Sequence, residues 1–220
     1  MAGKLRIIGG QWRGRRLPVP DVPGLRPTGD RAREVLFNWL RDRVRGARCL
    51  DLFAGTGALG LEAASRGAAS VTLVERDRKL AALLARVAAE WPAGDVLHIV
   101  RGDALVWLAR ETESSAESQD PSPGGAPFDL VFVDPPFDAG LYATTLAALR
   151  RPGLLAAGAR IYVESAARSP APVVAGETAC VAASSPCLAA DFADPGPAWE
   201  IVREKRVGDV RMQLLAVPGG

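Results

Sequence analysis

The chain has 220 residues, of which 48% are hydrophobic and 24% are charged, an ordinary balance for a globular protein. This composition argues against a disordered or fibrous chain, and no apolar run approaches the roughly 20 residues that a membrane-spanning helix needs. Three cysteines without a Cys-x-x-Cys pair, beside a single histidine, argue against a disulfide framework or a structural zinc site. A cytoplasmic protein without a metal is therefore expected, and a Cys180–Cys187 bridge is the less favoured alternative.

Charge is distributed unevenly along the chain. Residues 1–48 carry twelve basic and four acidic side chains, a net charge of +8, although the whole chain carries only +2. A local concentration of positive charge attracts polyanions whatever the net charge of the whole chain. The simpler explanation of the basic segment is that its side chains lie on a solvated helix face. Nucleic acid is therefore the favoured partner on this evidence.

The hydrophobic pattern predicts how the chain is organised. Residues 4–23 are expected to form short extended pieces, followed by a helix from Pro27 to Gly46. Beyond residue 48, strands alternate with helices, and a hairpin at 200–207 and 210–216 closes the chain. The predicted strands are 49–53, 70–74, 96–100, 128–133 and 159–163, and the predicted helices are 59–67, 77–87, 104–110 and 141–149. Asp77 is predicted to cap the second of these helices.

This alternation predicts a doubly wound α/β fold, in which helices cover both faces of a mostly parallel sheet and the hairpin adds an antiparallel strand at one edge. We divide the chain into a basic arm and helix, 1–47, and a main domain, 48–220. Residues 111–127 are predicted to be a loop, and residues 166–198 show no clear periodicity. Both segments are interpreted as insertions.

A glycine turn follows the first strand of the main domain. Gly55, Gly57 and Gly60 satisfy the G-x-G-x-x-G pattern, and Glu75 lies 20 residues beyond Gly55. The pattern alone fits a dinucleotide site or a purely steric turn. Asp51, however, would repel a pyrophosphate and attract a cationic group such as an ammonium.

S-adenosylmethionine carries such an ammonium, together with a ribose diol that suits Glu75 and an adenine amino group that suits Asp103. Asp103 could equally cap the helix that follows it. The candidate cofactor residues are Asp51, Phe53, Ala54, Gly55, Thr56, Gly57, Glu75, Arg76, Asp103 and Ala104.

The fourth predicted strand ends in Asp134-Pro135-Pro136-Phe137. The simpler interpretation is a strand that two prolines terminate. The chemical interpretation is that the prolines fix the backbone, so that the Asp134 carboxylate and the Pro135 carbonyl present two rigid acceptors to an exocyclic amine. Phe137 offers a flat face on which an unstacked base can lie, worth about 1–3 kcal/mol.

These motifs resemble known enzymes. Residues 134–137 resemble the signature of methyltransferases that act on amino groups of nucleic acids, and residues 51–57 resemble their S-adenosylmethionine loop. Residues 6–16, 24–28, 30–40, 57–62 and 162–165 resemble one family in particular, the bacterial 16S ribosomal RNA guanine-N2 methyltransferases. The resemblance covers residues 4–165 and returns weakly at 203–205, and nothing is carried onto the two insertions.

The resemblance implies a class I methyltransferase with a seven-stranded, Rossmann-like sheet. It implies that S-adenosylmethionine donates a methyl group to one guanine of 16S ribosomal RNA, within the small subunit or a late assembly intermediate, and leaves S-adenosylhomocysteine. We expect a monomer that uses no metal, with Asp134, Pro135, Pro136 and Phe137 at the catalytic site. The candidate RNA-binding residues are Arg13, Arg15, Arg16, Arg26, Arg31 and Arg33.

Several alternatives remain open from the residues alone. Arg31 and Arg33 could instead lie on an exposed helix face with salt bridges, and Trp12 could stack on a base or cover the core. The acceptor pair would also serve a methyltransferase acting on adenine N6 or cytosine N4 of DNA or RNA. The glycine pattern fits a nucleotide-dependent oxidoreductase. A non-catalytic RNA-binding or assembly factor is disfavoured by the intact tetrad at 134–137.

Overall fold

The computed structural model describes residues 4–20, 22, 29–117, 127–136, 140–173 and 198–217, with the backbone alone at 111–117. Its main sheet has seven strands in the order β5-β4-β3-β6-β7-β9-β8. The pairs β3–β4, β4–β5 and β3–β6 are parallel, whereas β7–β9 and β8–β9 are antiparallel. The predicted doubly wound, mostly parallel α/β fold is confirmed, including the antiparallel strands at one edge.

Contacts within the chain define two compact units, Met1–Ala104 with Leu130–Phe132, and Leu105–Asp129 with Val133–Gly220. The first unit begins with a small antiparallel sheet of β1 (Lys4–Arg6) and β2 (Arg16–Pro18). Each strand buries its central leucine and exposes its ends, as an alternating pattern requires. The predicted short extended pieces are thus confirmed.

Helix α1 (Asp30–Trp39) follows and buries Leu36 and Phe37. It is shorter than the predicted helix, because the backbone leaves the helical conformation at Leu40 and continues in turns to Gly46, which adopts a positive φ of 76°. The predicted helix start at Pro27 lies outside the described residues.

The remainder of the first unit alternates strands and helices. Helix α2 packs on β3 and β4, and α3 packs on β4 and β5. As predicted, Asp77 caps α3: its carboxylate accepts hydrogen bonds from the backbone N–H groups of Lys79 and Leu80. The elements are β3 (Arg48–Asp51), α2 (Ala58–Ser65), β4 (Ser70–Glu75), α3 (Arg78–Glu90), a short 3₁₀ turn (Gly94–Val96) and β5 (Leu97–Arg101).

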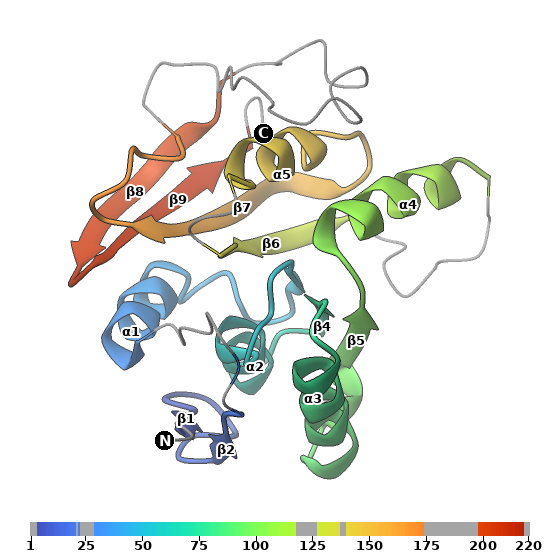
Figure 1. Ribbon diagram of the computed structural model, residues 1–220, viewed down its shortest axis with the longest axis vertical. Coiled ribbons are helices and arrows are strands. Elements are labelled where there is room, and N and C mark those ends of the chain that lie inside the picture. The colour runs from blue at the N-terminus through green and yellow to red at the C-terminus, as the bar shows by residue number, and fades with distance from the viewer. Residues whose placement is uncertain are drawn as a thin grey trace. The chain divides into compact units, whose positions relative to one another are not determined.

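The second unit contains most of α4 (Ala104–Glu117) and the strands that complete the sheet. Figure 1 shows the long hairpin of β8 (Glu200–Val207) and β9 (Val210–Ala216) in red, with β7 (Leu155–Ala166) in orange. The hairpin bounds agree with the prediction, as do those of β6 (Phe128–Val133). The last helix is α5 (Tyr142–Ala148).

The predicted bounds of two elements in this unit are wrong. Helix α4 extends to Glu117, so the first seven residues of the predicted loop 111–127 are helical. Three glutamates and an alanine among residues 111–117 favour a helix, so local propensity continues α4 although the apolar pattern stops. Strand β7 begins at Leu155 rather than at 159 and ends at Ala166. Residues 118–126 and 174–197, with Cys180 and Cys187, lie outside the described residues.

Candidate functional site

The glycine turn between β3 and α2 contains the first candidate residues. Gly55 and Gly57 adopt positive φ values of 54° and 78°, which side chains other than glycine disfavour. A Cβ on Gly57 would also lie 2.6 Å from a methyl group of Leu84. The glycines are therefore required by the local backbone, as the steric interpretation of the pattern proposed, and this requirement holds whatever ligand the turn binds.

Asp51 ends β3 and is almost completely buried, with 2% of its surface exposed. Its Oδ2 accepts a hydrogen bond of 2.9 Å from the Gly60 N–H in the first turns of α2. Burial, with a smaller contribution from the charge of Glu75, raises the pKa of the Asp51 carboxyl to about 7, although hydrogen bonds from the Gly60 and Phe53 N–H groups act to lower it. A cationic group placed beside Asp51 would favour the ionised carboxylate.

Glu75 ends β4 and ties together the loops around it. Its Oε2 accepts from the Gly55 N–H and its Oε1 from the Asp77 N–H, both at 2.7 Å. Its backbone carbonyl accepts from the Gly102 N–H at 3.1 Å, so the residues after β5 are held beside the end of β4. Each carboxylate oxygen keeps further acceptor capacity for a ligand hydroxyl.

The other predicted cofactor residues lie in or next to the three loops that follow β3, β4 and β5. Thr56, Ala54 and Ala104 are buried, Phe53 and Gly55 are half-buried, and Arg76 and Asp103 are exposed. All of them follow the carboxyl ends of β3, β4 and β5, the edge at which parallel α/β sheets bind ligands. Their contacts with a cofactor stay a prediction.

Asp134 and Pro135 follow directly after β6. Asp134 is half-buried, Pro135 is buried and Pro136 is exposed, and Phe137 lies outside the described residues. Strand β6 is the parallel neighbour of β3, with Phe132 paired to Asp51. Asp134, Tyr142 and Tyr162 all belong to the second unit. The negative charge of Asp134 contributes to raising the pKa of both phenols.

Several exposed basic side chains of the first unit lie in or next to its N-terminal sheet. Arg13, Arg15 and Arg16 are exposed there, and Arg31 is exposed on α1, so all four are accessible to a polyanion. The Arg15 guanidinium lies 5.1 Å from the centre of the Trp91 ring. Arg26 lies outside the described residues.

Trp12 covers the core rather than presenting its ring for stacking. Its side chain is 1% exposed, its indole N–H donates to the Pro92 carbonyl at 2.8 Å, and its ring packs edge-on against Trp91. Of the two roles that the sequence leaves open, the structure supports the structural one.

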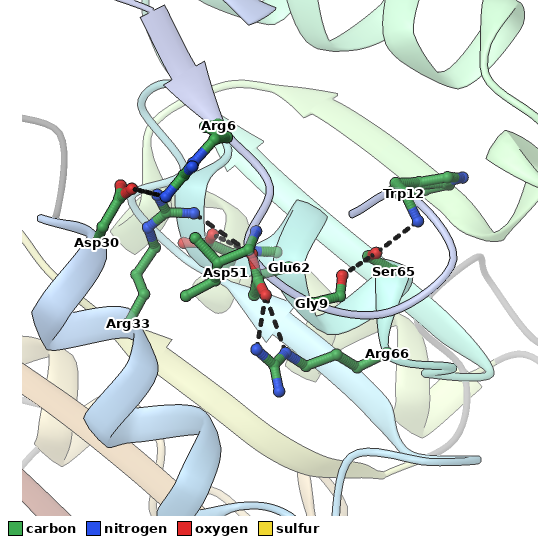
Figure 2. Close-up of polar contacts among 11 residues, drawn as sticks. Arg6, Gly9, Trp12, Asp30, Arg33, Asp51, Glu62, Ser65 and Arg66 are labelled. Atoms are coloured by element: carbon green, nitrogen blue, oxygen red, sulfur yellow. Dashed lines mark hydrogen bonds and ion pairs between the residues drawn. The ribbon is translucent and has the colours of Figure 1, made fainter. Parts of the chain in front are cut away.

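The expectation that Arg33 binds RNA is wrong. Its side chain is completely buried, and its guanidinium pairs with Glu62 at 3.3 Å and with Asp30 at 2.6 Å (Figure 2). Helical periodicity explains the difference: Arg33 lies on the face of α1 that also buries Leu36 and Phe37. The alternative interpretation predicted the salt bridges, although not the burial.

Glu62 is the partner that sequence reasoning missed. Figure 2 shows this fully buried carboxylate between Arg33 on one side and Arg66 on the other. Its Oε2 also accepts from the Ile8 N–H at 3.0 Å, and Ser65 bonds to both Gly9 and Trp12. Helix α2, which begins at the glycine turn, therefore also holds the N-terminal segment.

Among the residues that the structure describes, no three His, Cys, Asp or Glu side chains are grouped as ligands of a metal ion would be. The described helices include none that is both long enough and apolar enough to span a membrane. Cys49, the cysteine that the structure describes, is buried and belongs to no disulfide.

Comparison with known proteins identifies the family. Residues 5–184 match the family model described as Conserved hypothetical protein 95. Over 213 residues, 97% of this chain and 90% of the relative, the sequence is 44% identical to Ribosomal RNA small subunit methyltransferase D of Escherichia coli. The chain belongs to the ribosomal RNA small subunit methyltransferase D family.

Solved structures agree with this assignment. An Escherichia coli structure, named as a proposed methyltransferase, shares 41% identity and superposes with a TM-score of 0.74, covering 97% of this chain and 98% of that one. An RNA methyltransferase of Salinibacter ruber in complex with S-adenosyl-L-homocysteine is 14% identical, with a TM-score of 0.55 over 89% of this chain and 95% of that one. The second likeness shows the class I methyltransferase fold alone.

Proposed function

We propose that this protein transfers a methyl group from S-adenosylmethionine to the exocyclic N2 amine of a guanine in 16S ribosomal RNA of the small subunit. The observation that carries the proposal is its 44% identity, over 97% of the chain, to Ribosomal RNA small subunit methyltransferase D of Escherichia coli. The residues matched by the family model include both the glycine turn and the tetrad at 134–137. We infer that it acts as a cytoplasmic monomer on the small subunit or a late assembly intermediate.

The residues at the ends of β3, β4 and β5 fit the proposed cofactor. The buried Asp51 carboxyl, whose pKa is raised to about 7, is suited to a ligand cation, because such a charge offsets the unfavourable ionisation. Glu75 has acceptor capacity for a ribose diol beyond its two backbone bonds, and Asp103 is exposed for an adenine amino group. When bound, the cofactor supplies a sulfonium-activated methyl group.

Asp134 and Pro135 would prepare the target amine. An exocyclic amine is a poor nucleophile because its lone pair is shared with the ring. Two acceptors, the Asp134 carboxylate and the Pro135 carbonyl, would hold both N–H protons and orient the lone pair for in-line attack. Attack by the oriented nitrogen would form the nitrogen–carbon bond, and the electron pair of the broken carbon–sulfur bond would leave on sulfur. Asp134 then accepts the proton that the amine loses.

The exposed basic side chains would bind the RNA backbone. Arg13, Arg15, Arg16 and Arg31 are accessible in the structure, and Arg26 belongs to the same basic segment of the sequence. Contacts to phosphates position an RNA without reading its sequence, so these residues would contribute affinity rather than choice of base.

The test compares methyl transfer to three substrates: unmethylated small subunits, free 16S ribosomal RNA and duplex DNA. We expect transfer to small subunits, and mass spectrometry of the nucleosides should find N2-methylguanosine. N6-methyladenosine or N4-methylcytidine, or equal activity on DNA, would contradict the proposed base or substrate. Calorimetry with S-adenosylhomocysteine and with dinucleotides covers the oxidoreductase alternative, which tight binding of a dinucleotide alone would support.

A further inference from the structure

Two tyrosines of the second unit interact electrostatically with both Asp134 and a second carboxylate, Glu164. Tyr142 begins α5, and Tyr162 and Glu164 lie near the carboxyl end of β7, the strand next to β6 in the sheet. The charges of Asp134 and Glu164 act on both phenols, so the four side chains form one electrostatic group. The proposed methyl transfer uses only Asp134 from this group.

Glu164 is held in place as a hydrogen-bond acceptor. Because residues two apart on a strand point to the same side, Tyr162 lies beside Glu164, and its hydroxyl donates to Oε2 at 2.7 Å. Both side chains are buried, with 1% and 3% exposed. Burial, together with the Glu164 charge, keeps the pKa of the Tyr162 phenol well above its ordinary value, so the phenol remains a donor and Glu164 the acceptor.

Tyr142 offers the complementary group, a donor without a partner. Its hydroxyl oxygen is buried and, among the described residues, forms no hydrogen bond, which is unfavourable for a polar atom removed from water. Burial and the two nearby carboxylates raise the pKa of this phenol too, so it keeps its proton. An acceptor atom on a ligand would satisfy it.

Guanine presents a matching series of groups along its Watson–Crick edge: the N2 amine, the N1–H donor and the O6 acceptor. We propose that Glu164 accepts the N1–H and Tyr142 donates to O6 while Asp134 holds the N2 amine, so that this cluster selects guanine. The proposal rests on the proposed function, and it names residues that choose the base in that same site.

The cluster would select guanine because its contacts attract the groups of guanine and repel those of the other amino-bearing bases. Adenine and cytosine also carry an exocyclic amine, but the ring nitrogen beside it is an acceptor, whose lone pair a carboxylate repels. Sites built to hydrogen-bond one particular group of a substrate reject the analogue that lacks that group. Asp134 and Pro135 alone would accept any of the three amines.

2-Aminopurine tests this directly, because it keeps the N2 amine but has neither the N1–H nor O6. Small subunits are reconstituted with 16S ribosomal RNA carrying either guanine or 2-aminopurine at the target position, and kcat/KM is measured for each. We expect the wild-type protein to prefer guanine by at least about 100-fold. Equal rates on the two bases would overturn the proposal without recourse to any variant.

Two variants assign the preference to its residues. Glu164→Gln should lower kcat/KM on guanine about 100-fold and leave the rate on 2-aminopurine unchanged or raised, because the amide can donate to N1. Tyr142→Phe should lower the rate on guanine about tenfold and leave 2-aminopurine unaffected, since that base lacks O6. The matched control is Glu200→Gln, an exposed glutamate on β8 in the same unit.

A fall of equal size on both bases would overturn the assignment, because a structural defect or a slower chemical step does not depend on N1–H or O6. An undiminished preference for guanine in both variants would overturn it as well. The proposed function has a separate readout: if wild-type protein forms no N2-methylguanosine on unmodified small subunits, that proposal fails, whatever the variants do.

Discussion

Replacing Asp51 by asparagine separates the charge of this residue from its structural bond. The asparagine side-chain oxygen can still accept the Gly60 N–H, which the aspartate holds at 2.9 Å, but it carries no charge. If Asp51 binds the ammonium of the cofactor, binding requires the ionised form of a carboxyl whose pKa is about 7 in the free protein. Affinity must then depend on pH.

The size of the effect follows from that pKa. Each unit of pH below about 7 should weaken binding roughly tenfold, so that the dissociation constant is about 100-fold larger at pH 5 than on the plateau. Above about pH 8 the ligand ammonium itself loses its proton and affinity falls again. Asp51→Asn should bind about tenfold or more weakly at pH 7.5, and its low-pH slope should disappear.

Calorimetry with S-adenosylhomocysteine between pH 5 and 8.5 measures this, since the ligand has the ammonium but no methyl group to transfer. Asp95→Asn, at an exposed carboxylate of the same unit, is the matched control and should reproduce the wild-type profile. A wild-type affinity that does not change between pH 5 and 7.5 would refute the reasoning, as would an Asp51→Asn protein with wild-type affinity.

Ionisation of the Asp51 carboxyl strengthens cofactor binding as the pH rises, but it should lower the stability of the free protein. A carboxyl whose pKa is raised by folding contributes full stability below its unfolded value of 3.8, and this contribution is lost as pH rises through about 7. The loss reaches about 4 kcal/mol at pH 8 as an upper figure. Asp51→Asn should therefore raise the free energy of unfolding at pH 8 and leave it unchanged near pH 4, as denaturant titration can show.

Three further substitutions test other parts of the molecule. Asp134→Ala should lower methyl transfer at least about 100-fold while the melting temperature and the affinity for S-adenosylhomocysteine stay near wild type; retained turnover would remove its assigned role. Arg33→Met should cost about 3–5 kcal/mol in the free energy of unfolding, because Glu62 loses a buried partner, and should leave the salt dependence of RNA binding unchanged. Replacing Arg13, Arg15 and Arg16 together by alanine should reduce the slope of log affinity against log salt by about 2, whereas the same change on α3 should not. The α3 control residues are exposed: Arg78, Lys79 and Arg86.

Local patterns predicted most of the fold because each left a distinct signal. The apolar run at 128–133, the Asp77 cap and the hairpin around Gly208 all depend on neighbouring residues alone, and the structure has them at the predicted positions. The ends of the first helix and of α4 were wrong, because apolar periodicity says little about where backbone hydrogen bonding stops.

The site was harder to predict where long-range pairing decides the role of a residue. Arg33 belongs by composition to a basic segment, but its burial depends on Glu62, which lies 29 residues further along the chain. Tyr142 lies within the predicted helix 141–149 without a motif to single it out, and only its unpartnered hydroxyl and the nearby carboxylates suggest a role. The spacing of Tyr162 and Glu164 places both side chains on one side of β7, but the predicted strand 159–163 ended before Glu164.

The attachment of the N-terminal segment to α2 has a practical consequence for truncated proteins. A fragment that starts at residue 48 would keep every predicted cofactor residue, yet its Glu62 would lose the Ile8 amide and the Arg33 guanidinium together. Ser65 would lose its bonds to Gly9 and Trp12 in the same step. Removing residues 1–47 to isolate catalysis from RNA binding would thus uncover buried polar groups of α2. Point substitutions at exposed arginines therefore separate the two activities more cleanly than deletion.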